Sequence, residues 1–221
     1  MKFLKRFGDN TNKNSLASKA RKKRHLFFLE FLKNFDGKIR ILDIGGTESY
    51  WESMDFDKDN VEITLLNLFS VDCKKNNFLS VVGDATDMSE YSDASFDLVF
   101  SNSCIEHLFT YSNQQKMASE ILRVGKSHFI QTPNKNFFIE PHFLFPFYQF
   151  LPNSFKLFLL TNFRMGHIGV INDKVEAQLQ IDEIRLLSSN EFITLFPDSS
   201  IFEERFLFFT KSYIAYKIRV E

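Results

Sequence analysis

Residues 39–47, with the sequence IRILDIGGT, predict a buried strand that ends in a glycine turn. The apolar run is short enough for one strand, and Gly45 and Gly46 then break it. A buried parallel strand that ends in glycines is where an α/β sheet brings its backbone close to a ligand. Asp43 stands near the carboxyl end of this strand, where open sheets bind their ligands. We therefore expect a cofactor at this edge of the sheet.

The glycine turn lacks the features of a nucleotide-phosphate loop. A dinucleotide fingerprint needs G-x-G-x-x-G, but the frame from Gly45 reads GGTESY, and Glu48 would oppose a phosphate. No Gly-Lys-Ser/Thr of a Walker loop follows either. A carboxylate at the strand end instead suits a ligand with a positive ammonium or sulfonium group. An ordinary strand and turn is the alternative interpretation.

These residues resemble the first motif of the class I S-adenosyl-L-methionine (SAM)-dependent methyltransferases. That motif is an apolar strand followed by Asp/Glu-x-Gly-x-Gly, which Asp43 and Gly45 match while Thr47 replaces the last glycine. The resemblance implies an α/β fold with a Rossmann-like seven-stranded sheet and helices on both faces. It also places Asp43, Gly45, Gly46 and Thr47 around the amino-acid part of SAM.

The composition fits one α/β domain over residues 1–221. A net charge of −1 gives no strong field for nucleic acid. Two cysteines, Cys73 and Cys104, in a chain with no secretory signal pattern favour free thiols and a cytoplasmic protein. Residues 1–36 predict a loose start and then a basic helix that includes KARKKR at 19–24, with Gly37 as its stop. We interpret the basic run as a solvated helix face, with an anchor on acidic lipid or nucleic acid as the alternative.

Residues 61–68 and 78–82 predict the second and third strands. In many methyltransferases an acidic residue at the end of the second strand binds the ribose hydroxyls, and Asn67 occupies that place here. Asp84 matches the family position that accepts from the adenine amino group, with the backbone of Ala85 meeting a ring nitrogen. A turn or helix N-cap is the ordinary alternative for Asp84.

Residues 95–108 predict a fourth strand, FDLVF, that leads into SNSCIEHL. This pattern resembles the fourth-strand motif of small-molecule methyltransferases and places Ser101 and Asn102 beside the methyl group. His107 either lines the cofactor pocket or packs and caps a helix start. Some quinone-type relatives form a metal site with a second glutamate where Ser103 stands here, so we predict no metal.

Residues 117–124 predict a helix that Gly125 ends, and residues 127–131 predict the fifth strand. Residues 134–188 then form an insertion whose segment 137–160 is strongly aromatic. Three prolines interrupt that segment, so it is not a membrane span. It is interpreted as an acceptor-side lid, with a greasy surface for a lipid-linked substrate and plain core packing as alternatives. Peripheral membrane contact stays open.

The insertion contains candidate bases for methyl transfer to a hydroxyl. His142 is the first candidate because histidine titrates near neutral pH, with Glu140 as an orienting or alternative base. His167 is a second candidate, in a glycine-flanked loop. Each of these residues could equally be structural, and sulfonium transfer can proceed by proximity and orientation alone.

Residues 182–197 predict a helix capped at Ser188 or Ser189, and residues 200–209 and 212–219 predict a terminal hairpin that turns at Thr210-Lys211. The segments TPN…IEPH…LP and LSSNEFITLFPDSSIFEERF resemble bacterial methyltransferases of polysaccharide and cell-envelope biosynthesis.

The sequence thus predicts a SAM-dependent methyltransferase that acts on a hydroxyl of a small molecule or glycan. The alternatives are an inactive SAM-binding scaffold, an RNA methyltransferase and, disfavoured by the missing glycines, a nucleotide-dependent oxidoreductase.

Overall fold

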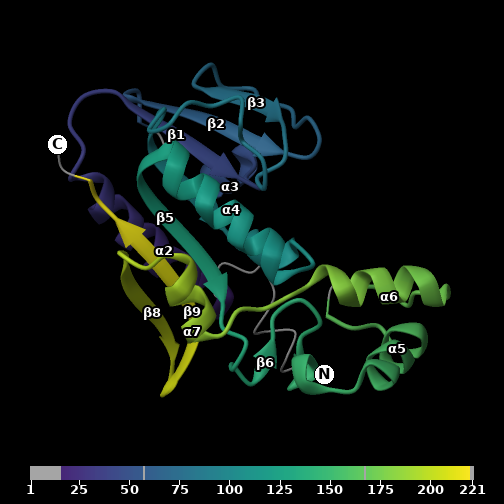
Figure 1. Ribbon diagram of the computed structural model, residues 1–221. Coiled ribbons are helices and arrows are strands. Elements are labelled where there is room, and N and C mark those ends of the chain that lie inside the picture. The colour runs from purple at the N-terminus through teal and green to yellow at the C-terminus, as the bar shows by residue number, and fades with distance from the viewer. Residues whose placement is uncertain (1–15, 57, 167, 220–221) are drawn as a thin grey trace.

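A seven-stranded sheet forms the centre of the computed structural model, which describes residues 16–56, 58–166 and 168–219 (Figure 1). The strand order is β3-β2-β1-β4-β5-β9-β8. The strands are β1 (Ile39–Ile44), β2 (Val61–Asn67), β3 (Phe78–Val82), β4 (Phe96–Asn102), β5 (Gly125–Pro133), β8 (Ser200–Phe206) and β9 (Phe209–Lys217). Strands β1 to β5 pair in parallel, and β9 runs antiparallel to both of its neighbours. The predicted seven-stranded α/β sheet is confirmed.

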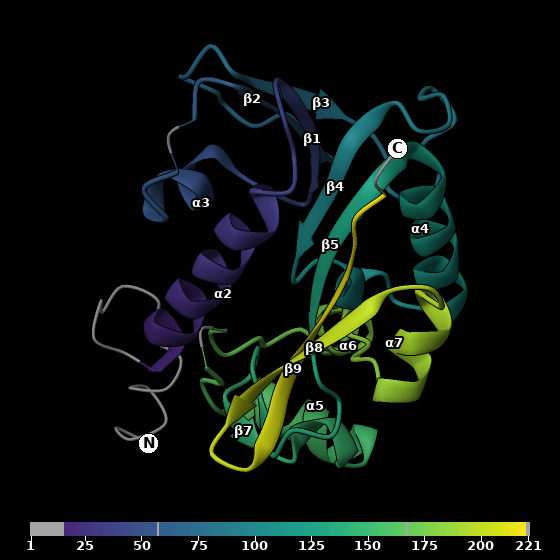
Figure 2. The same cartoon turned by 90° about the vertical axis from the view of Figure 1, so that its left-hand side faces the viewer.

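Helices cover both faces of the sheet (Figure 2). Helices α2 (Leu16–Leu32) and α3 (Glu48–Ser53) lie on one face, and α4 (Tyr111–Val124) and α7 (Ser189–Leu195) lie on the other. A short 3₁₀ helix, η1 (Ile105–His107), follows β4. None of the described helices is long and apolar enough to cross a membrane.

Edge-to-face contacts between phenylalanine rings join α2 to the sheet. Phe28 contacts Phe100 of β4 and Phe129 of β5 with ring centroids 4.8 and 5.1 Å apart, and Phe31 contacts Phe129 at 5.4 Å. All four rings are buried. Each such pair contributes about 0.5–1.5 kcal/mol beyond its buried area. This aromatic layer fixes α2 across the carboxyl half of the sheet.

The insertion forms a separate layer beside the carboxyl edge (Figure 1). Its elements are β6 (Ile139–Glu140), β7 (Phe145–Pro146), η2 (Tyr148–Phe150), α5 (Asn153–Asn162) and α6 (Lys174–Glu183). The insertion has its own apolar core, in which Tyr148 and Leu160 are buried against Ala177. Core packing therefore accounts for part of its aromatic content, while other rings such as Phe147 and Phe158 stay exposed.

Two predicted boundaries are wrong. Helix α2 ends at Leu32, five residues before Gly37, because the N–H groups of residues 33–35 donate to carbonyls three residues back, as in turns. The terminal hairpin turns at Leu207-Phe208, and Thr210 pairs inside β9 with Arg205. Leu207 adopts a left-handed φ of 54° in this turn, and the register between β8 and β9 shifts between Glu204 and Arg205.

The interpretation of the basic run as a solvated helix face is wrong for Arg24. Lys22 and Lys23 are exposed, but Arg24 is 7% exposed. The Arg24 guanidinium donates to the Glu204 carboxylate, with Nη2 2.7 Å from Oε2, and to Gln131 Oε1 at 2.9 Å. It is buried because α2 lies directly across the carboxyl ends of β4 and β5.

Candidate active site

The turn after β1 packs its glycines against the side chains of Asp43 and Cys104. Gly45 has a φ of 77°, a left-handed conformation that favours glycine, and its N–H donates to Leu66 O at 2.9 Å. A Cβ on Gly46 would lie 1.7 Å from Asp43 Oδ2, so the Asp43 carboxyl lies directly against this glycine. Thr47 is the N-cap of α3, and its Oγ1 accepts from Tyr50 N. The threonine that replaces the last glycine of the motif therefore starts the next helix.

Asp43 is a buried carboxyl with one side-chain donor. It is 1% exposed, and Trp51 Nε1 donates to its Oδ2 at 2.7 Å. Burial raises the pKa of Asp43 to about 7, although the Trp51 hydrogen bond acts in the opposite direction. Asp43 therefore changes charge near neutral pH, and a cationic ligand would favour its ionised form.

Three of the side chains predicted to touch the cofactor hold the sheet edge together. Asn67 Nδ2 donates to Gly46 O at 2.9 Å, and Ser101 Oγ, which is fully buried, donates to Ile44 O at 3.1 Å. Asn102 Oδ1 accepts from the buried arginine of α2. These bonds give all three residues a supporting role, and their contact with a cofactor stays a prediction.

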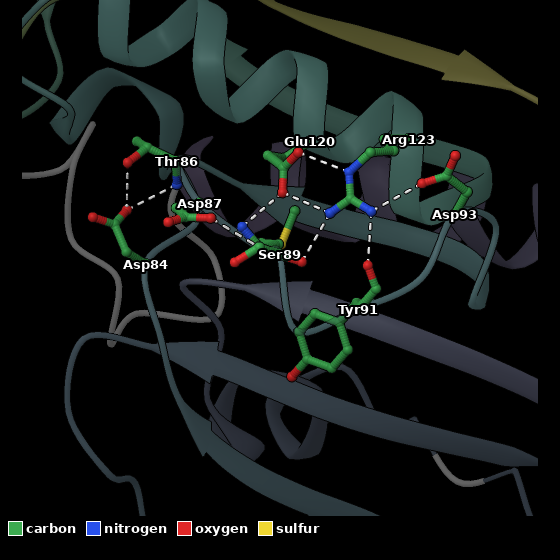
Figure 3. A network of polar contacts seen from close by, with 9 residues as sticks. Asp84, Thr86, Asp87, Ser89, Tyr91, Asp93, Glu120 and Arg123 are labelled. Atoms are coloured by element: carbon green, nitrogen blue, oxygen red, sulfur yellow. Dashed lines mark hydrogen bonds and ion pairs between the residues drawn. The ribbon is translucent and has the colours of Figure 1, made fainter.

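Asp84 organises the loop after β3 (Figure 3). Its Oδ1 accepts from Thr86 N and Thr86 Oγ1, both at 2.8 Å, which is the turn role given above as the alternative. Figure 3 shows the rest of the loop tied to α4, where Glu120 accepts from Met88 N at 2.6 Å and Arg123 pairs with Glu120. Asp84 is exposed and Ala85 is buried. Their contact with adenine stays a prediction.

His142 and Glu140 form a tight pair in the turn after β6. His142 Nδ1 lies 2.7 Å from Glu140 Oε1, and Glu140 Oε2 accepts from the backbone N–H groups of His142 and Phe143 at 2.7 Å. Burial alone would lower the pKa of His142, but the Glu140 hydrogen bond and nearby carboxylates raise it. Glu140 is 1% exposed, so the geometry favours its predicted orienting role over a role as a base.

A second pair faces the first. His107 Nδ1 lies 2.9 Å from Glu183 Oε1, and the His107 and His142 rings stand nearly perpendicular with centroids 4.9 Å apart. Glu106 is fully buried, and burial raises the pKa of its carboxyl. Both histidines lie close enough to act on this pKa in the opposite direction. We call Glu106, His107 and His142, with Glu140 and Glu183, the acid–base cluster.

Glu106 and Glu183 are the members of the cluster that sequence reasoning did not single out. Glu106 stood in the quoted EHL motif, which was a usable signal. Glu183 lies 76 residues after His107, at the end of α6, and nothing local marked it. His167, the second candidate base, lies outside the described residues.

Cys104 joins the glycine turn to the acid–base cluster. A Cβ on Gly45 would lie 2.6 Å from Cys104 Sγ. Burial raises the pKa of the Cys104 thiol to about 12, with further contributions from Glu106 and Asp43. The thiol is therefore protonated and unreactive. It lies close enough to the carboxyls of Asp43 and Glu106 for both to raise its pKa. The two groups of residues share one edge of the sheet.

Residues 43–128 match the family model described as a methyltransferase domain. This part of the chain is therefore similar to a methyltransferase domain. This match starts at Asp43 and includes the glycine turn, the loop of Asp84, and Glu106 and His107. His142 and Glu183 lie beyond it, in the insertion that this chain adds to the domain. No curated protein matches the sequence at a significant level.

Solved structures share the fold of the methyltransferase domain. Phosphoethanolamine N-methyltransferase 2 of Haemonchus contortus, in complex with phosphomonomethylethanolamine and S-adenosylhomocysteine, is 19% identical with a TM-score of 0.51 over 82% of this chain and 38% of that chain. The same enzyme with SAM is 17% identical, with a TM-score of 0.51 over 90% and 46%. A possible exported protein from Bordetella parapertussis is 11% identical, with a TM-score of 0.54 over 92% and 70%.

At these identities the likeness shows the fold alone. Because the chain spans less than half of the length of the nematode enzyme, the substrates of that enzyme do not transfer with the fold. The class I SAM-dependent methyltransferase fold implied by the sequence is confirmed.

Proposed function

We propose that this protein transfers a methyl group from SAM to a hydroxyl of a small molecule or glycan, in cytoplasmic steps of cell-envelope polysaccharide biosynthesis. The observation that carries this proposal is the meeting of the glycine turn and the acid–base cluster at one sheet edge, joined by Cys104. The polysaccharide class is supported by the sequence resemblance of the insertion and C-terminal segments.

The glycine turn fits the amino-acid part of SAM. Gly45 is exposed and Gly46 is half-buried, so their backbone is open to a ligand, while a Cβ on either would collide with Cys104 or Asp43. Asp43 beside them suits a cationic ligand, and Asn67 keeps the turn in place through Gly46 O. SAM supplies an electrophilic methyl group on a positively charged sulfur. The protein's task is to hold the acceptor oxygen in line with that methyl group.

The acid–base cluster fits activation of an acceptor hydroxyl. When a hydroxyl oxygen takes a methyl group, its proton has to leave, and a nearby histidine lowers the barrier for that step. Glu140 orients His142, and His107 lies against the His142 ring. Glu106 belongs to the same cluster. We therefore propose that the acceptor hydroxyl is activated at this cluster.

Asp43→Asn tests the cofactor site through its pH dependence. Asp43 must be ionised to attract a cation and its pKa is about 7, so a cation that binds beside it drives off a proton. The dissociation constant for SAM, measured calorimetrically, should fall by up to about tenfold per pH unit from pH 5.5 to 7 and then level off. Asp43→Asn should bind SAM weakly with no slope in this window. An equal slope in the variant would contradict the assignment of Asp43.

The same substitution should affect stability in the opposite direction. The folded pKa of Asp43 is raised above its unfolded value of 3.8, so ionisation costs folding free energy as the pH rises through the window from about 4 to 7. Asp43→Asn removes this cost. The variant should therefore unfold at a higher temperature than the wild type at pH 8 while binding SAM less tightly.

His142→Ala should reduce turnover at least roughly 100-fold with little change in SAM affinity, because general acid–base catalysis contributes about 10²- to 10⁴-fold. Labelled methyl transfer from SAM to cell-envelope extracts measures the turnover, and calorimetry measures the binding. His25→Gln, which alters a histidine that packs against Phe56, is the control and should leave both unchanged. Near-wild-type turnover of His142→Ala would remove His142 from the reaction.

The extract assay also separates an enzyme from an inactive scaffold. A scaffold would bind SAM and transfer no methyl group to any extract fraction. Incorporation into RNA, with binding that weakens steeply as salt rises, would favour the RNA methyltransferase instead.

A further inference from the structure

We propose that Glu106, His107 and His142 form a binding site for a divalent transition-metal ion of the Zn²⁺ type. One possible ligand atom from each of the three side chains lies within 4.8 Å of the others. His107 comes from η1, and His142 comes from the turn between β6 and β7, so the site closes only when the insertion folds onto the sheet. This proposal reverses the sequence-based expectation, which considered only the residues around Ser103.

The strongest indication is an oxygen of Glu106 that has no partner. Glu106 is fully buried, and its Oε2 accepts from Thr132 Oγ1 at 3.1 Å. Its Oε1 is buried and makes no hydrogen bond with any described residue. A buried carboxylate oxygen left without a partner destabilises the fold. A cation bound to Oε1 would remove that destabilisation.

The two histidines are held as metal-binding histidines are held. His107 Nδ1 is bonded to Glu183 and His142 Nδ1 is bonded to Glu140, at 2.9 and 2.7 Å. Metal-ligating histidines almost always donate their other ring N–H to a carboxylate or carbonyl, which fixes the ring and raises the basicity of the ligating nitrogen. The Nε2 atoms of both rings are then the ligand atoms.

The charge of the cluster favours a cation. The cluster combines three carboxyl groups with two histidines, and Glu106 and Glu140 are at most 1% exposed. Imidazole nitrogens select Zn²⁺ and related transition metals, whereas Mg²⁺ prefers an all-oxygen octahedron. Two histidines and one glutamate also form the protein ligands of catalytic zinc sites that keep a position open.

The three side chains must move slightly to bind an ion. Ligands that bind Zn²⁺ at about 2.0–2.2 Å in a tetrahedron lie roughly 3.3–3.5 Å from one another. The present separations extend to 4.8 Å. Small side-chain rotations close this difference, since His142 lies on a turn outside the central sheet.

This inference deepens the proposed function and rests on it only for the role of the ion. An ion with an open position would bind the acceptor oxygen and lower the pKa of its hydroxyl, so that the proton leaves to water as the O–CH₃ bond forms and the S–CH₃ electron pair stays on sulfur. His142, proposed above as the base, would then promote loss of the hydroxyl proton through the ion, and His142→Ala would still lower turnover. Ion binding itself needs neither SAM nor an acceptor.

Metal binding is tested on the full chain after removal of metals with a chelator. We expect Zn²⁺ to bind with one ion per chain in a chelator-competition titration, and Co²⁺ to give visible absorption typical of a site with nitrogen ligands. Mg²⁺ should not compete. Glu106→Gln and His142→Gln should each abolish the Co²⁺ spectrum. Glu140→Gln, which removes only the carboxylate behind His142, should weaken Zn²⁺ binding roughly 10- to 100-fold.

Two control variants show whether Zn²⁺ binds at residues outside the acid–base cluster. His25→Gln and Cys73→Ser change possible ligands outside the cluster and should leave Zn²⁺ affinity unchanged. Thermal unfolding of each variant shows whether it is folded. If a variant is unfolded, stoichiometric Zn²⁺ binding by the wild type still tests the proposal. Absence of stoichiometric Zn²⁺ binding to the wild type, or a Co²⁺ spectrum that survives in a folded His142→Gln, would overturn the proposal. SAM binding by the metal-free protein tests the cofactor site separately.

Discussion

Gly46→Ala is expected to abolish SAM binding, with a loss of at least roughly 100-fold, or about 2.7 kcal/mol. The added Cβ would lie 1.7 Å from Asp43 Oδ2 and 2.2 Å from its Cγ. The Asp43 side chain cannot simply swing away, because it is buried and accepts the Trp51 N–H. Either the turn or the carboxyl must shift, and both belong to the proposed cofactor site. Calorimetric titration with SAM measures the effect.

The fold should also be less stable in this variant. Overpacking of a filled interior costs typically about 1–3 kcal/mol, which thermal or denaturant unfolding would detect. Gly169→Ala is a matched control, because a Cβ there meets nothing within 4 Å. It should leave SAM binding and stability near wild-type values.

A double substitution separates crowding from loss of function. Asp43→Gly in the Gly46→Ala background removes the group with which the new methyl collides. It should restore much of the lost stability and leave SAM binding absent. Wild-type SAM affinity in a folded Gly46→Ala protein would show that the cofactor does not approach this turn.

The parts of the fold with local signals were predictable. The apolar run and glycines at the end of β1 are neighbours in sequence, and so are the residues of the capping box at Ser188 and Glu191. Gly125, predicted to end α4, is its C-cap. In each case the interactions that decide the structure join residues a few positions apart, so the sequence pattern is sufficient.

The parts that depend on distant partners were not predictable. His107 was visible as a motif residue, but Glu183 joins it from the end of α6, and His142 reaches it from another insertion turn. A sequence shows which residues can donate or accept, but not which of them meet. The same limit explains Asp84 and Asn67, whose side chains bond to nearby backbone and leave their predicted contacts with SAM to experiment.

Arg24 is the clearest case of a role set by distance, because its main partner, Glu204, is 180 residues away. Arg24→Met should lower the free energy of unfolding by about 3–5 kcal/mol, since it leaves a buried carboxylate without its counter-charge. Glu204 is 7% exposed, and Ser212 Oγ remains as its other side-chain donor. Lys23→Met, one residue away on the exposed face, should change stability by less than about 0.5 kcal/mol.

The loss of unfolding free energy in Arg24→Met should depend on pH in a way that identifies the ion pair with Glu204. Burial would raise the pKa of Glu204, but Arg24 and the Ser212 hydrogen bond outweigh burial and hold it below its usual 4.5. The wild type therefore keeps this stabilisation above about pH 4.5 and loses it as the pH falls through the lower folded value. In Arg24→Met the unpaired Glu204 takes up a proton more easily, so the difference between variant and wild type should be largest near pH 7 and shrink toward pH 4.

Removing both charges separates the contribution of the ion pair from that of the other hydrogen bonds of Arg24. Arg24→Met with Glu204→Met should be more stable than Arg24→Met alone, because replacing a buried ion pair by apolar side chains is often neutral or stabilising. A double variant no more stable than Arg24→Met would mean that the loss came from the bonds of Arg24 to Gln131 and Asn102 at the ends of β5 and β4. The unfolding free energies of the wild type, Arg24→Met and the double variant thus decide whether α2 is held across the sheet edge by the charge pair or by the hydrogen bonds.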